Sequence, residues 1–230
     1  MMEPVMMVPG LGSDGAVWNR TIEQLGSGYD CQVGDTLSDA TLAGMAERVL
    51  AGSPERFALA GVSMGGMVAM TIMRLAPDRV TRLALFDTNA RPDMPEQTAR
   101  RRMASAAMLA ATDLRALAAP SIASMVHPDT GQDVRDALAD MTVRVGAATD
   151  ARQNEAVAAR DDLRPILPGI AVPTLVVVGA EDAMTPPAYA EEIANAVPSA
   201  NLHIIADCGH LPPIEKPKET AALLRAWLKR

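Results

Sequence analysis

The sequence predicts an α/β protein: a mostly parallel sheet of about six strands, flanking helices and an inserted helical segment. Short apolar runs alternate with helical patterns along most of the chain, which favours strands joined through helices. The apolar runs lack clean alternation of polar and apolar residues, so we expect burial on both faces of the sheet. A third observation is that residues 91–168 contain no convincing strand pattern.

The elements follow in chain order. The expected strands are Val5–Val8, Tyr29–Val33, Phe57–Val62, Val80–Phe86, Val172–Gly179 and Asn201–Ala206. The expected helices are Ala16–Leu25, Leu42–Ala51, Gly65–Leu75, Ala188–Val197 and Lys216–Lys229. No internal repeat or low-complexity segment interrupts this order.

The stretch 91–168 is rich in Ala, Met and Arg, with breaks at Pro120, Pro128–Gly131 and Gly146. It is far longer than a crossover between two strands needs. We expect a helical cap over one end of the sheet, with 1–90 and 169–230 forming the core. An extension of the core or a dimer contact is the alternative.

Length and composition exclude several classes. The 230 residues are 49% apolar and 21% charged, as in an ordinary globular domain, and the net charge of −7 disfavours nucleic acid as a partner. The longest apolar run, Val172–Ala180, is interrupted and too short for a membrane span, and Met1–Pro4 lacks a signal-peptide pattern. Two cysteines, Cys31 and Cys208, make no disulfide framework. We therefore expect a soluble, cytoplasmic, single-domain protein.

The sharpest motif is Gly61-Val62-Ser63-Met64-Gly65, between an apolar run and a helical pattern. A nucleophile on a tight strand-to-helix turn has a strained backbone and needs small residues two positions before and after it. Ser63 is the predicted nucleophile. A glycine-rich turn with an unimportant serine is the alternative.

A serine hydroxyl needs a hydrogen-bonded base. His210 lies in a loop after the last expected strand, at the sheet edge where open α/β sheets bind ligands. His203 falls inside that strand, where we expect it to point into packing, and His127 lies in the expected cap, where we expect a surface role. His210 is therefore the favoured base.

The base in turn needs an acid that fixes its tautomer. Asp182 follows the strand that ends at Gly179, and Asp87 follows the strand that ends at Phe86. Glu181 and Asp207 lie nearby, and we expect both to point to solvent. Asp182 is the favoured acid and Asp87 the second choice.

Two backbone amides are candidates for stabilising an oxyanion. The loop Val8-Pro9-Gly10-Leu11-Gly12-Ser13 follows the first expected strand, and its glycines let backbone approach a ligand. The second donor is the N–H of Met64, the residue after the nucleophile.

The order Ser63, Asp182, His210, with the Ser-Met-Gly-Gly elbow and the Gly-His loop, resembles the α/β-hydrolase superfamily over nearly the whole chain. The resemblance implies an oxyanion hole formed by the amides of Leu11 and Met64. The short form with one cap is similar to esterases, enol-lactonases and hydrolases of the menaquinone and biotin pathways. Two departures stand out. The first strand corresponds to the third strand of the family, and Val8-Pro9-Gly10 replaces a common His-Gly pair.

The expected function is hydrolysis of a small-molecule carboxylic ester, thioester or lactone by acyl transfer through Ser63, His210 and Asp182. The same triad also serves lyases and C–C hydrolases, and a ligand receptor on a hydrolase scaffold is a further alternative. The histidines and cysteines have no metal-ligand spacing and no phosphate-binding glycine loop is present, so we expect neither metal nor cofactor. The oligomeric state stays open.

Two features of the expected cap bear on its substrate. Arg100-Arg101-Arg102 predicts a solvated helix face, with recognition of a carboxylate-bearing substrate as the alternative. A set of methionines leads us to expect an apolar wall facing Ser63: Met94, Met103, Met108, Met125 and Met141.

Overall fold

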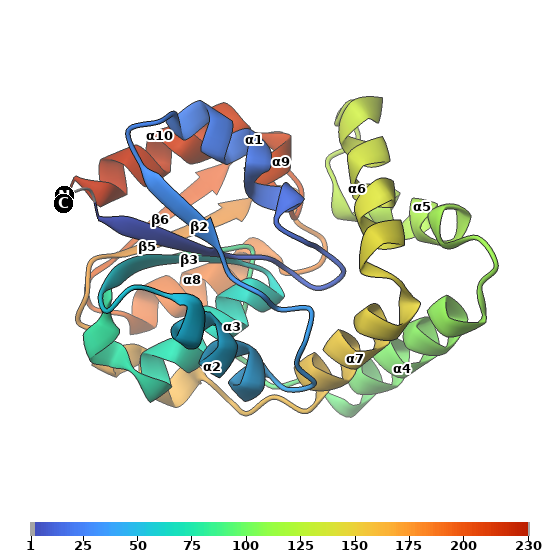
Figure 1. Cartoon of the computed structure of the whole chain (residues 1–230), viewed down its shortest axis with the longest axis horizontal. Helices are drawn as coiled ribbons and strands as arrows, with labels where there is room; N and C mark the ends of the chain where they lie inside the picture. Colours follow the sequence, from blue (N-terminus) through green and yellow to red (C-terminus); the bar gives the residue numbers. More distant parts are fainter. Residues whose placement is uncertain (1–2, 230) are drawn as a thin grey trace.

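The computed structural model describes residues 3–229, and within them six strands form one parallel sheet in the order β2-β1-β3-β4-β5-β6. Each pair of neighbours is parallel, as the sequence predicts, and the fold class is confirmed (Figure 1). The strands are β1 Pro4–Val8, β2 Asp30–Val33, β3 Phe57–Val62, β4 Val80–Phe86, β5 Thr174–Gly179 and β6 Ala200–Ile205.

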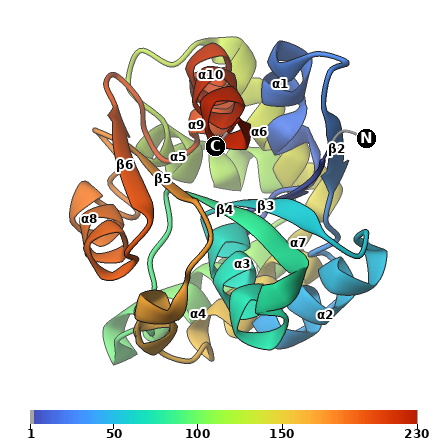
Figure 2. The same cartoon turned by 90° about the vertical axis from the view of Figure 1, so that its left-hand side faces the viewer.

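Helices cover both faces of the sheet. Figure 2 shows α1, α9 and α10 on one face, with α2, α3 and α8 on the other. The helices are α1 Ala16–Leu25, α2 Leu42–Gly52, α3 Met64–Leu75, α4 Pro95–Ala110, α5 Leu114–Met125, α6 Gln132–Val145, α7 Ala147–Ala158, α8 Pro187–Ala196, α9 Pro212–Glu215 and α10 Pro217–Leu228. Two 3₁₀ turns, η1 Pro77–Arg79 and η2 Arg164–Gly169, complete the described chain.

Alternating residues of the central strands supply two apolar clusters, one on each face. On β1, Met6 and Val8 join the cluster beneath α2, α3 and α8, while Val5 and Met7 join the cluster beneath α1 and α10. Every residue of β3 and β5 is buried, which explains why these strands lack alternation in the sequence.

The two edge strands differ from this pattern. β2 and β6 are partly exposed, because each has a neighbouring strand on one side only. His203 on β6 is exposed, so the expectation that it points into packing was wrong. An edge position cannot be recognised from a short apolar run, which explains the error.

Between β4 and β5, the segment 91–168 holds the helices α4 to α7, which lie beyond the carboxyl ends of the strands (Figure 1). Helix α4 packs against α7, and α5 packs against α6. A buried ion pair fixes the base of this segment: Arg160 Nη1 donates to Asp93 Oδ1 at 2.6 Å, with side-chain exposures of 3% and 1%. Arg101 adds a second ion pair to Asp93 at 2.7 Å.

The methionines of this segment do not form one wall. Met94 and Met103 are 62% and 73% exposed, whereas Met141 is buried in the cluster that also contains Trp18. Ser105 is the one buried residue described for α4, which packs mainly against α7. The expected methionine wall was therefore wrong for Met94 and Met103.

No helix among residues 3–229 is both long and apolar enough to cross a membrane.

Candidate active site

Ser63 lies at the sharp turn between β3 and α3. Its backbone has φ 55° and ψ −119°, a left-handed conformation that costs energy in a residue other than glycine. Its carbonyl accepts the Gly66 N–H at 2.9 Å and the Thr88 hydroxyl at 2.7 Å, which together hold the turn. The small residues predicted around it are needed: a Cβ on Gly61 would overlap the Gly65 carbonyl, and one on Gly65 would overlap the Val8 carbonyl.

Ser63, His210 and Asp182 form a continuous chain of hydrogen bonds, although 147 residues separate Ser63 from His210. The Ser63 Oγ lies 2.8 Å from His210 Nε2, and His210 Nδ1 lies 2.8 Å from Asp182 Oδ2. The three residues follow β3, β5 and β6, so the carboxyl edge of the parallel sheet brings them together.

Asp182 is almost fully buried but well supplied with donors. Its Oδ1 accepts the N–H groups of Met184 at 2.8 Å and Thr185 at 3.0 Å, and its Oδ2 accepts the Thr185 hydroxyl at 2.7 Å. Burial by itself would raise the pKa of Asp182, but the hydrogen bond and charge of His210 and the bonds from Thr185 outweigh it and hold the pKa well below its usual range. Asp182 is therefore an ionised partner for His210. The role of Thr185 was missed in the sequence, where it reads only as part of a turn before Pro186.

The loop that carries His210 is fixed on both sides. The His210 N–H donates to the Met125 carbonyl at 2.8 Å. The Glu215 carboxylate accepts the Gly209 N–H at 3.2 Å and the Leu211 N–H at 2.9 Å. Glu215 also accepts the His127 N–H at 2.8 Å and the Thr130 hydroxyl at 2.8 Å, so it ties the His210 loop to the turn after α5. Glu215 was missed in the sequence analysis.

The two backbone N–H groups named as oxyanion donors are free to take an acceptor. Among the hydrogen bonds described for residues 3–229, neither the Leu11 N–H nor the Met64 N–H has an acceptor. The Leu11 loop lies against Ser63, since a Cβ on Gly10 would come to 3.3 Å from the Ser63 Cβ. The Gly12 N–H donates to Gln153 Oε1 of α7 at 2.9 Å, a contact that the sequence does not signal.

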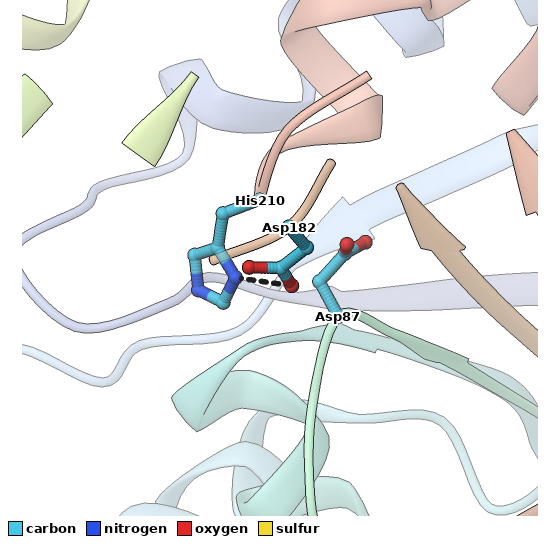
Figure 3. A group of neighbouring side chains, drawn as sticks. All are labelled: Asp87, Asp182 and His210. Carbon is cyan, nitrogen blue, oxygen red and sulfur yellow. Dashed lines mark hydrogen bonds and ion pairs between the residues drawn. The ribbon is translucent and has the colours of Figure 1, made fainter. Parts of the chain in front are cut away.

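The other candidate residues have different places. Asp87 is buried beside Asp182 and His210 (Figure 3), whereas Glu181 and Asp207 are exposed, as expected. His127 is partly buried and its Nδ1 accepts the Asp129 N–H at 3.1 Å, whereas the histidine hydrogen-bonded to the Ser63 Oγ is His210.

Within residues 3–229, two groups of three residues lie close enough to share a metal ion. Asp87, Asp182 and His210 form one, and His127, Glu181 and Asp207 form the other. In the first group the His210 nitrogen that faces Asp182 is already hydrogen-bonded to it, and both Asp182 oxygens accept protein donors, so hydrogen bonding explains the cluster. The second group lies mostly at the exposed surface.

The arginine run is largely engaged within the helical segment. Arg101 pairs with Asp93, and Arg102 pairs with Glu155 of α7 at 3.0 Å. Arg100 is exposed. The solvated face expected from the sequence fits Arg100 and Arg102, which is 63% exposed in its side chain.

A family model described as the alpha/beta hydrolase fold matches residues 3–217. The chain belongs to the alpha/beta hydrolase fold family. The resemblance found in the sequence is thereby confirmed over nearly the whole chain, and this α/β hydrolase is an enzyme similar to carboxylic ester hydrolases.

Individual relatives agree with this placement. The α/β hydrolase is 26% identical over 241 residues to a pimeloyl-[acyl-carrier protein] methyl ester esterase of Aromatoleum aromaticum, covering 96% of each chain. Its structure is similar to that of a thermophilic esterase from Thermogutta terrifontis, with a TM-score of 0.90 and 30% identity over 99% of this chain and 89% of that one. It is also similar to an enol-lactonase from Burkholderia xenovorans, with a TM-score of 0.88 and 25% identity over 100% and 92% of the two chains.

Proposed function

We propose that this α/β hydrolase cleaves a carboxylic ester or lactone of a small molecule by acyl transfer through Ser63, His210 and Asp182. The observation that carries the proposal is the chain of two 2.8 Å contacts from Ser63 Oγ through His210 to Asp182. The esterases and the enol-lactonase among its relatives support the choice of an ester or lactone over the C–C bonds and receptors considered above.

Each group has one task in this mechanism. Ser63 Oγ attacks the substrate carbonyl carbon while His210 Nε2 accepts the hydroxyl proton. The Leu11 and Met64 N–H groups stabilise the negative oxygen of the tetrahedral intermediate. His210 returns the proton to the departing alkoxide, which leaves as the alcohol. Water then attacks the acyl-enzyme and loses a proton to His210, which passes that proton to the departing Ser63 Oγ as the acid is released. Asp182 holds the His210 tautomer and supports the imidazolium.

The helices α4 to α7 would act as a cap over this site, because the turn after α5 contacts the His210 loop and α7 contacts the Leu11 loop. An apolar acyl pocket beneath such a cap predicts that each added methylene raises kcat/KM by about fourfold until the pocket fills. A series of neutral esters set beside matching dicarboxylic half-esters measures this, and the Arg100→Gln variant tests whether the exposed arginine favours the charged series.

Two measurements test the chemistry itself. Purified protein is assayed against chromogenic esters, thioesters and lactones, and treated with a fluorophosphonate. We expect turnover and one adduct on Ser63, both lost in Ser63→Ala, with turnover falling by several orders of magnitude. Labelling that survives Ser63→Ala removes the mechanism. Labelling of Ser63 without turnover of any ester would favour the C–C hydrolase, lyase or receptor alternatives.

A further inference from the structure

Asp87 is a buried acidic residue that the mechanism above does not use. It follows β4, the residue is 1% exposed, and its backbone has a left-handed φ of 44°. Oxygen or nitrogen atoms of Asp87, Asp182 and His210 lie within 4.8 Å of one another, and Figure 3 shows Asp87 and Asp182 side by side at the ends of neighbouring strands. A strained backbone that places a second carboxyl group against the first calls for a physical reason.

The two carboxyl oxygens of Asp87 have different hydrogen-bonding surroundings. Oδ1 accepts the Gly179 N–H at 2.9 Å, whereas Oδ2 is buried without a hydrogen-bond partner among the described residues. If Asp87 were ionised, Oδ2 would be a buried acceptor with no donor. The nearby Asp182 carboxylate could not supply one, because an ionised carboxylate only accepts hydrogen bonds. A proton on Oδ2 converts it into a donor, and the nearby Asp182 carboxylate is the acceptor that suits it.

The charges around Asp87 favour the protonated form. The titratable groups near it are Asp182 on the loop after β5 and, after β6, Cys208, His210 and Glu215. Within residues 3–229 no Lys or Arg forms an ion pair with Asp87. Burial and then the negative charge of Asp182 raise the pKa of Asp87 well above its usual range, against the opposing bond from Gly179.

We propose that Asp87 is a neutral carboxylic acid that donates a hydrogen bond to Asp182 and so positions this residue for its contact with His210. Asp87 is a positioning residue, since it acts through Asp182 and does not touch the reacting atoms. The expected effect of Asp87 on turnover rests on the proposed catalytic role of Asp182. The protonation of Asp87 does not depend on that role and can be tested without any activity.

Infrared difference spectroscopy reads the protonation directly. The spectrum of the full-length protein at neutral pH minus that of Asp87→Asn should show the carbonyl stretch of one protonated carboxyl group. The Asn side chain tolerates the left-handed backbone, keeps an acceptor for Gly179 and keeps a donor for Asp182. A carboxylate band in place of the carbonyl band would overturn the proposal, even in a protein with no esterase activity.

Kinetics test the positioning role, using two variants that both tolerate a positive φ. We expect Asp87→Gly, which removes the donor, to lower kcat by about tenfold or more with KM changed by less than about threefold. Asp87→Asn should restore most of the kcat. The acid-side midpoint of the pH profile of kcat/KM should stay in place in Asp87→Asn. If Asp87 were ionised, removal of a charge so close to the imidazole would lower this midpoint by about one pH unit or more. Equal losses in the Gly and Asn variants would also overturn the positioning role.

Discussion

The Gly12 N–H donates to the side-chain oxygen of Gln153 at 2.9 Å, across 141 residues of sequence. Gln153 is 0% exposed, and its amide nitrogen donates to the Thr36 carbonyl at 3.0 Å. Gly12 has a positive φ of 66° and follows Leu11 in the turn closed by the 3.3 Å bond from the Ser13 N–H to the Gly10 carbonyl. One side chain of α7 thus fixes the loop that carries an expected oxyanion donor.

Gln153→Leu tests this connection. The apolar side chain removes the partner of the half-buried Gly12 N–H and of the buried Thr36 carbonyl, and the buried carbonyl alone costs about 1–3 kcal/mol when unsatisfied. We expect kcat to fall about tenfold to a hundredfold with a small change in KM, because a loosened loop misplaces the Leu11 amide. Steady-state kinetics beside thermal unfolding separate the two effects. Gln132→Leu, at an exposed position of α6, is the control. A destabilised variant with normal kcat would show that the loop keeps its shape without Gln153.

The acid of the proposed triad is tested by comparing two carboxyl groups. Asp182→Asn should lower kcat by about three to four orders of magnitude, because the amide stabilises the wrong tautomer of His210. Asp87→Asn should cost far less, because the hydrogen bond to the imidazole, 2.8 Å long, comes from Asp182. The kcat values of the two variants, measured with one activated ester, give this comparison. If the ranking were reversed, the acid would be Asp87.

Glu215 offers a test of the loop that carries His210. Its carboxylate accepts four donors, and Glu215→Gln would turn an NH₂ group toward some of them. We expect a loss of about 1–3 kcal/mol in the free energy of unfolding and a fall in kcat of about tenfold or more. Glu219→Gln, exposed on the next helix, controls for the lost charge. If Glu215→Gln were as active as Glu219→Gln, the Glu215 carboxylate would not be needed to place His210.

These contacts show what the sequence could and could not predict. The central strands were recognisable because burial on both faces leaves uninterrupted apolar runs, and Ser63 was recognisable because its turn demands small neighbours at fixed spacing. His210 and Asp182 were found because parallel strands bring their following loops to one edge. Their hydrogen-bond geometry agrees with the sequence-based assignment, while their catalytic roles stay predictions. Gln153 and Glu215 carried no signal, since each acts on backbone groups of a segment remote in sequence.

The helical segment was the least predictable part. Its length and position could be inferred, but alternation of Met with Ala does not indicate which helix packs on which. The structure pairs α4 with α7, leaving Met94 and Met103 exposed, and uses the buried Asp93–Arg160 pair at its base. Similarly, His203 was misplaced because the residues of a strand do not specify its place in the order of the sheet.

Stability should depend on pH through Asp87. Because its pKa is raised in the folded protein, its contribution to stability is complete below the unfolded value of about 3.9 and is lost as pH rises toward the folded value. An Asn side chain does not titrate, so its contribution to stability does not change with pH. We therefore expect Asp87→Asn to unfold at a higher temperature than the unaltered protein at pH 7, with the difference shrinking toward pH 4. Asp78→Asn, at an exposed position in η1, should show no such trend. A gain that is independent of pH would contradict the shifted pKa.

The geometry of the turn at Ser63 predicts that alanine substitutions at Gly61 and Gly52 will have very different effects on stability. A Cβ on Gly61 would overlap the backbone carbonyl of Gly65, and backbone on both sides of the turn is too tightly packed to move away. Gly61→Ala should therefore cost about 3 kcal/mol or more of stability, and should displace Ser63 from His210 in whatever protein still folds. Gly52, the last residue of α2, has no positive φ, and a Cβ added there would meet no atom within 4 Å, so Gly52→Ala should be neutral or stabilise by up to about 1 kcal/mol. Chemical denaturation gives both values, and fluorophosphonate labelling rates report the placement of Ser63. A Gly61→Ala protein that is stable and labels at the normal rate would mean that the turn can relax, and that the strain at Ser63 is not needed to present its hydroxyl to His210.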